Sequence, residues 1–320
     1  MRTGLICLVL MALLALAALP QQPNPPDIDE TPTLRLDVEL VNILFSVRDK
    51  RGGLVPNLTK EDFTLNEDGK PQEIKFFTRE TELPLTLGLL VDVSRSQENL
   101  IATERHAASQ FFSRVLRPKD MAFLISFGSD AELLQDYTNS VPLLSEALNK
   151  LRVNSQPVGF HPGPVPTMSN PRGTILYDAL YLATTEQLRN QVGRKALIVI
   201  SDGMDYGSRT KLDEAVAAAH RADAIVYSIY FTDSRFYPGS DSALKRISNE
   251  TGGRVFRVDR KHTLQSIFDE IQEEMRSQYA LGYTSTNPNK DSGFRKIEIR
   301  STDKDLKVQA RKGYFAQAGQ

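Results

Sequence analysis

The chain has 320 residues, of which 40% are hydrophobic and 25% are charged, and its formal net charge at pH 7 is −1. Such a composition is typical of a globular protein with room for one large domain and something smaller. Because positive and negative charges balance, the sequence offers no electrostatic basis for binding nucleic acid or an anionic membrane surface.

The first residues predict a secretory signal peptide. Met1-Arg2 is followed by the apolar run Leu5 to Leu19, which has small residues near its end, and this order of regions is typical of such signals. The run is shorter than the ~20 apolar residues of a membrane-spanning helix, and Pro20 ends it; an uncleaved anchor is the alternative. Cleavage after residue 18 would remove Cys7, the only cysteine. The mature protein would then be secreted or periplasmic, without a thiol, a disulfide or a stable membrane span.

A linker and a short β segment follow. Residues 19–33 are rich in Pro, Asp and Gln, which predicts a disordered linker. Within 34–82, weak alternation predicts a strand over Leu36 to Arg48, a hairpin signal follows at 49–53, and Ile74 to Phe77 reads as another strand. Between them, residues 58–70 predict a short helical turn, a strand and an Asp-Gly turn.

Residues 83–277 alternate between apolar strands and helical patterns, which predicts an α/β fold with a doubly wound, mostly parallel sheet and helices on both faces. Ala131 to Tyr137, close behind the second strand, reads as an antiparallel edge strand. The last helical pattern covers Thr263 to Met275. The predicted parallel strands are Leu85 to Val91, Met121 to Phe127, Ala196 to Ile200, Ala224 to Phe231 and Arg254 to Val258.

The motif that carries chemistry follows the first of these strands. Asp92, Ser94 and Ser96 place one carboxylate and two hydroxyls on alternate residues, and oxygen ligands of this kind suit a hard divalent cation such as Mg²⁺. Taken alone, the motif could also cap a helix, since Ser and Asp commonly accept hydrogen bonds from free backbone N–H groups there. Two later residues complete a larger set: Thr174, at the start of a helical pattern, and Asp202, at the end of the strand over Ala196 to Ile200.

This order of residues resembles the von Willebrand factor type A domain and its metal-ion-dependent adhesion site. The resemblance covers roughly Leu83 to Ser277. It implies that Asp92, Ser94, Ser96, Thr174 and Asp202 hold a divalent cation, Mg²⁺ first, with Mn²⁺ and Ca²⁺ as alternatives. It also implies that a protein partner supplies an acidic residue as the last ligand. In open α/β sheets, ligands bind at the carboxyl ends of the strands where the strand order switches, which is where Asp92 and Asp202 are expected.

A proline-rich stretch precedes Thr174. Residues 151–172 include five prolines and cannot form a helix. Long loops of this kind are commonly functional or disordered. We predict a specificity loop at the rim of the metal face, with a plain insertion as the alternative.

A second β tract ends the chain. A strand over Ser277 to Thr284 begins it, and residues 278–316 continue with a turn, strands over Phe294 to Arg300 and Leu306 to Ala310, and the closing segment Arg311 to Phe315. Together with the 58–68 segment, these sequence segments resemble the bacterial secreted group called the VWFA-related domain family, often called acidobacterial. Neither flank alone has enough strands for an independent core, so we predict that 278–316 pairs with 34–82 as one small β module.

Other chemistries find less support. The four histidines occur singly, without metal-ligand spacing, and the common hydrolase and nucleotide-binding motifs are missing. A magnesium phosphatase also places an Asp after its first strand but needs a second acid two residues later, where Ser94 stands. We therefore expect a binding protein and no enzyme, with Arg95 as a candidate partner contact. A structural envelope module with a vestigial metal site and the hydrolase remain the alternatives.

Overall fold

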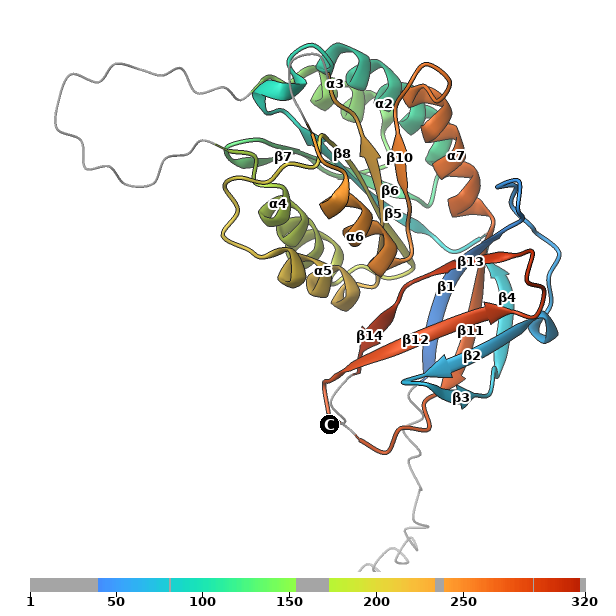
Figure 1. The fold of residues 1–320 in the computed structure, drawn as a ribbon. Helices are drawn as coiled ribbons and strands as arrows, with labels where there is room; N and C mark the ends of the chain where they lie inside the picture. The colour runs from blue at the N-terminus through green and yellow to red at the C-terminus, as the bar shows by residue number, and fades with distance from the viewer. Residues whose placement is uncertain (1–39, 81, 154–172, 234–238, 290, 317–320) are drawn as a thin grey trace, which may run out of the picture. The chain divides into compact units, whose positions relative to one another are not determined.

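The computed structural model describes residues 40–80, 82–153, 173–233, 239–289 and 291–316 (Figure 1). All described residues belong to one compact unit, Glu39–Gln320. The predicted signal peptide, the linker and residues 154–172 of the proline-rich stretch lie outside the described residues. Among the described residues, no helix is long and apolar enough to cross a membrane.

A six-stranded sheet forms the centre of the α/β part, in the order β10-β9-β8-β5-β6-β7. The first five strands are parallel, and β7 runs antiparallel to β6 at the edge. The strands are β5 (Leu85–Asp92), β6 (Met121–Phe127), β7 (Ala131–Thr138), β8 (Arg194–Ser201), β9 (Ala224–Tyr230) and β10 (Val255–Arg257).

Helices cover both faces of this sheet because its central strands are apolar on both sides (Figure 1). On β5, Leu87 and Leu89 pack toward one helix layer and Leu90 toward the other. Gly88 has no room for a side chain, since an added Cβ would lie 2.3 Å from the Phe123 Cζ atom. One layer holds α2 (Ile101–Val115), α3 (Val141–Asn149) and α7 (Leu264–Arg276); the other holds α4 (Leu176–Leu182) with its π-helical continuation η4 (Ala183–Leu188), α5 (Leu212–Arg221) and α6 (Ser242–Thr251).

The flanking segments form two antiparallel four-stranded sheets, ordered β13-β1-β11-β4 and β14-β12-β2-β3. Both sheets contribute to one apolar core, in which the rings of Phe45 and Phe63 meet edge to face at 5.1 Å. The strands are β1 (Leu40–Arg48), β2 (Phe63–Glu67), β3 (Lys70–Gln72), β4 (Phe76–Glu80), β11 (Gln278–Thr284), β12 (Phe294–Ser301), β13 (Lys307–Ala310) and β14 (Gly313–Phe315); the short turn η2 (Lys60–Asp62) precedes β2.

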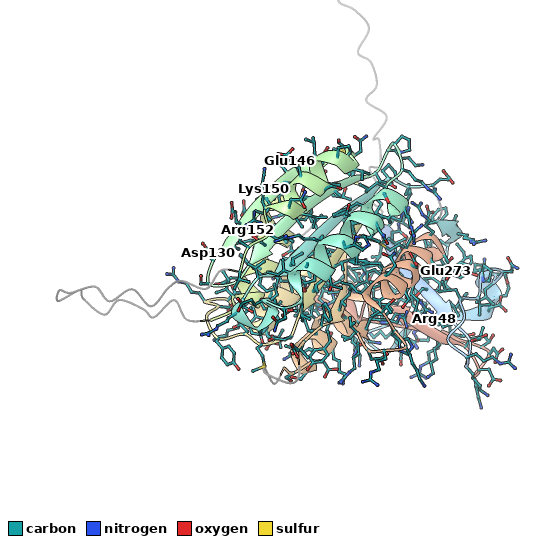
Figure 2. All side chains as sticks on the ribbon, turned by 90° about the horizontal axis from the view of Figure 1, so that it is seen from above. Arg48, Asp130, Glu146, Lys150, Arg152 and Glu273 are labelled. Carbon is teal, nitrogen blue, oxygen red and sulfur yellow. The ribbon has the colours of Figure 1, made fainter. Side chains whose placement is uncertain are left out.

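A buried carboxylate on α7 joins the two parts. Glu274 is fully buried and accepts hydrogen bonds from Ser46 (3.0 Å) and Arg48 (2.6 Å) on β1 and from Arg254 (3.0 Å) before β10. Arg48 lies on the side of the molecule where α7 meets the flanking strands, far from Asp130 in the view of Figure 2. Because a buried charge is costly unless paired, this cluster ties α7 to β1.

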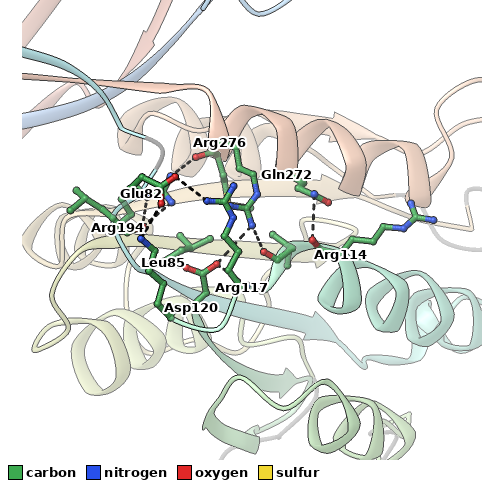
Figure 3. Close-up of polar contacts among 12 residues, drawn as sticks. Glu82, Leu85, Arg114, Arg117, Asp120, Arg194, Gln272 and Arg276 are labelled. Carbon is green, nitrogen blue, oxygen red and sulfur yellow. Dashed lines mark hydrogen bonds and ion pairs between the residues drawn. The ribbon is translucent and has the colours of Figure 1, made fainter.

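The two ends of the α/β part lie together at the edge opposite the predicted metal site. Arg194, at the start of β8, donates to the carbonyl oxygens of Leu83 (2.9 Å) and Met275 (2.6 Å). Asp120 accepts a hydrogen bond from the Leu85 backbone (3.0 Å; Figure 3). Beyond this point β4 and β11 pair directly. One polar cluster therefore holds both segments that connect the α/β part to the flanking strands.

The sequence-predicted fold class is confirmed: a mostly parallel sheet between two helix layers, plus a β module built from both flanks. The antiparallel edge strand is confirmed as β7. The strand β3, which contains Pro71, was not predicted. The domain boundaries drawn from the sequence stay predictions.

Candidate metal site

The first and last members of the predicted set lie at the carboxyl ends of neighbouring strands. Strands β5 and β8 pair in parallel up to Val91 opposite Ile200. Asp92 ends β5, and Asp202 directly follows β8. The chain leaves β5 for β6 on one side and returns to β8 on the other, so this is the switch in strand order where α/β sheets bind ligands.

The two serines of the motif face each other. The Oγ atoms of Ser94 and Ser96 lie 3.0 Å apart, which matches the ~3 Å between neighbouring ligands of an octahedral Mg²⁺ ion with bonds of ~2.1 Å. Ser94 stands at the N-cap of the short helix η3 (Arg95–Gln97), yet its side chain makes no capping hydrogen bond. The capping role that the motif could have served is therefore not what its hydroxyls do here.

Backbone hydrogen bonds fix Thr174 between two of the strand ends. Its carbonyl oxygen accepts hydrogen bonds from the N–H groups of Tyr206 (3.0 Å) and Gly207 (3.3 Å) in the loop after β8, and Ile175 N–H donates to Gly128 O (3.0 Å) after β6. Gly173 permits this approach, because an added Cβ would lie 2.6 Å from the Tyr206 Cβ. Thr174 is itself buried, so backbone contacts hold the predicted threonine ligand in place at these strand ends.

Asp92 is held tightly. Its Oδ1 accepts a hydrogen bond from Ser94 N–H (2.9 Å) and its Oδ2 from the Ser201 hydroxyl (2.7 Å). Burial, aided by the negative charge of Asp202, raises the pKa of Asp92 to about 7, while the hydrogen bonds from Ser94 and Ser201 oppose this. A positive charge beside Asp92 would relieve this cost of burying a carboxylate.

Two buried groups next to Asp92 escaped the sequence analysis. Ser201 orients Asp92 and also accepts a hydrogen bond from Gly203 N–H (3.0 Å). Glu104, on α2, is fully buried, and neither carboxylate oxygen has a hydrogen-bond partner among the described residues. Burial and the nearby Asp92 raise the pKa of Glu104 well above its usual range. An acid on the apolar stripe of a helix, three residues after Ile101 and four before Ala108, was the available signal for Glu104.

The rim of the site carries exposed side chains of two kinds. Arg95, between the two serines, is exposed, and Tyr206 is 68% exposed although its backbone is bound to Thr174. The proline-rich stretch enters the described residues again at Gly173, and residues 154–172, with the predicted specificity loop, lie outside them.

The donor set suits a hard cation. Within the described residues, no group of three or more His, Cys, Asp or Glu side chains is placed to hold a metal ion. The candidate site instead offers two carboxylates and three hydroxyls. Oxygen donors with few negative charges are the ligands with which Mg²⁺ commonly binds proteins, and they leave positions for water or a further acid.

No protein-family model and no curated protein matches the chain. Solved structures with similar folds include the BatB protein of Bacteroides thetaiotaomicron (18% identity, 60% of this chain and 97% of that chain, TM-score 0.46). Another is proximal thread matrix protein 1 of the mussel byssus with a zinc-occupied MIDAS motif (13% identity, 66% and 50% of the two chains, TM-score 0.49). A third is the VWA domain of SpRpn10 (15% identity, 59% and 95%, TM-score 0.40). Likenesses at this level decide no question of function.

Proposed function

We propose that this chain is a metal-dependent protein-binding module in which Asp92, Ser94, Ser96, Thr174 and Asp202 hold a divalent cation, Mg²⁺ first. The observation that carries the proposal is the pair of serine hydroxyls at 3.0 Å, free of any helix-capping role, beside the buried Asp92. The cation would supply an open coordination position for a carboxylate of the partner. With only two carboxylates on the protein side, a further acid is favoured by charge.

Arg95 is the proposed partner contact at this site. Its guanidinium is exposed and lies in the chain between the two ligand serines. There it can grip the second oxygen of an incoming carboxylate through charge-assisted hydrogen bonds. Lysine would replace it only in part, because an ammonium lacks the planar fork.

Two alternatives from other classes are weighed by the same geometry. A phosphatase that uses Asp92 as its nucleophile would need a second acid two residues later, and Ser94 stands at that position. A vestigial site in a structural envelope module would also show a well-packed Asp92. The metal titration described next separates this alternative from the proposal.

The proposal includes the compartment and the group of proteins. The signal-like residues 1–18 support a secreted or periplasmic protein, and the two flanking β segments support kinship with the VWFA-related secreted group. Pairing of β1 with β11 agrees with that arrangement of segments.

The first test is metal binding. Mg²⁺ or Mn²⁺ that binds only the folded chain should raise its melting temperature by mass action, and Asp92→Ala should abolish the rise. Asp136→Ala, which removes an exposed acid on the edge strand β7, is the matched control and should keep it. A melting curve of the wild type that millimolar metal leaves unchanged would contradict the site.

The second test is partner capture. An envelope extract passed over the immobilised protein should yield a bound protein with Mn²⁺ and none with chelator or with Asp92→Ala. Arg95→Ala should weaken that binding by about tenfold or more, since a charge-assisted hydrogen bond contributes ~1.5–3 kcal/mol, and should leave metal affinity in place. Metal binding without any metal-dependent capture would favour the vestigial envelope module.

A further inference from the structure

A polar hollow lies at the β module, apart from the candidate metal site, and the elements that line it take no part in that site. It has a volume of about 860 Å³ and is lined by the end of α5, the segment after η4, the start of β1 and the strand β14. Besides Tyr314, its ionisable side chains are Arg189, His220, Arg221, Asp223 and Arg311. Three arginines face one carboxylate, so the hollow carries a net positive charge.

Most of this charge has no partner among the described residues. Arg311 is the one arginine with a carboxylate, since it contacts Asp223 at 2.6 Å. Arg221 lies over the ring of Phe315, 4.0 Å from its centroid, and makes no ion pair in the described part of the chain. Arg189 is exposed and likewise has no hydrogen bond or ion pair there. Two guanidinium groups are therefore available to a ligand.

Buried nitrogen atoms at the wall of the hollow also lack partners. His220 is only 6% exposed, and in the described residues neither of its ring nitrogens makes a hydrogen bond. Burial and the charge of Arg311 lower the pKa of His220 to about 4, although a backbone contact with Gly313 raises it. The Nε atom of Arg311 is buried and unpartnered as well. Buried polar atoms are nearly always hydrogen-bonded, so such a group indicates a missing partner.

We propose that this hollow binds a small oxyanion ligand with at least two negative charges, of the phosphate monoester or polycarboxylate class. Arg189 and Arg221 offer planar forks that match the oxygen spacing of both groups. His220 and the Arg311 Nε–H offer donors deeper in the wall. Aromatic rings at Tyr314 and Phe315 border the hollow and can pack against the carbon skeleton of the ligand.

The test is calorimetry with inorganic phosphate and with citrate as probes, each against sodium chloride at equal ionic strength. At least one probe should bind the wild type, and the double variant Arg189→Gln/Arg221→Gln should bind it about tenfold more weakly or worse. The control Arg51→Gln/Arg260→Gln removes two exposed arginines elsewhere with the same change in net charge, and it should bind as the wild type does. The probe that binds more tightly identifies the ligand class.

A second measurement keeps the result independent of folding. The imidazole NMR signals of His220 should shift on addition of the binding probe, whereas those of the exposed His262 should not. The proposal is overturned if neither probe binds, or if the cavity and control variants lose affinity equally. It is equally overturned if binding leaves the His220 signals in place.

Discussion

Acid should destabilise this protein through His220, the buried histidine where α5 meets the β module. Its ring lies against Phe294, with centroids 5.2 Å apart, and burial and the charge of Arg311 lower its pKa from 6.5 to about 4. In the unfolded chain the imidazole takes up a proton as the pH falls below 6.5, while in the folded protein it stays neutral until about pH 4. Protonation in this window therefore favours the unfolded state.

The size of the effect follows from the two pKa values. One pKa unit corresponds to ~1.4 kcal/mol, so the histidine should lower the free energy of unfolding by about 2 kcal/mol between pH 7.5 and pH 5, and by about 3 kcal/mol at pH 4. The measurement is urea unfolding at several pH values for the wild type and for His220→Gln, which cannot take up the proton. The carboxylates are the same in both proteins. The difference between the two unfolding free energies at each pH therefore isolates the contribution of the histidine.

The control is His106→Gln, in which the replaced side chain is exposed and hydrogen-bonds Gln110. It measures what the loss of a surface histidine does to the pH profile. If the profiles of the wild type and His220→Gln run parallel between pH 7.5 and pH 5, the histidine is not buried as a neutral ring and the reasoning fails.

Three further substitutions test other parts of the fold. Glu104→Gln should stabilise the metal-free protein, and more so at pH 8 than at pH 5. A carboxyl whose pKa is raised in the folded state destabilises the protein as the pH rises above the carboxyl's unfolded pKa. Glu146→Gln on α3, an exposed site, should show no such gain in urea unfolding. Glu274→Ala should cost about 3 kcal/mol, since it removes the carboxylate of Arg48 and one of the two carboxylates that Arg254 contacts. A loss under 1 kcal/mol in the same assay would argue against the cluster. Gly88→Ala should cost about 1–3 kcal/mol by overpacking against Phe123, and an unchanged melting temperature would contradict that packing.

The parallel sheet could be predicted because its strands are buried on both faces. Continuous apolar runs such as those of β5 and β8 are readable without knowledge of their partners. The helix after Thr174 was placed less well: α4 begins at Leu176, because Thr174 and Ile175 use their backbone groups to join neighbouring loops. A local pattern carries no record of such contacts.

The flanking sheets show where sequence reasoning ends. Their strands alternate and could be found one by one, but the pairing of β1 with both β11 and β13 joins residues more than 200 positions apart. Register over such distances is decided by the shared core rather than by any local signal. At the candidate site the same limit hid Glu104, whose unusual burial becomes visible only when α2 lies on the sheet beside Asp92.

The chain passes twice between the β module and the α/β part, and Arg194 contacts both of these connections through Leu83 and Met275. Directly beyond them, Glu80 on β4 pairs with Gln278 on β11. Within the β module, the entire α/β part thus takes the place of a hairpin loop between β4 and β11. A folded insert whose ends already meet imposes little of the closure entropy that a flexible loop of equal length would. We expect the β module to accept other inserted domains. A different domain whose ends lie as close together could replace the α/β part between β4 and β11, which would change what is bound without changing the strands of the β module.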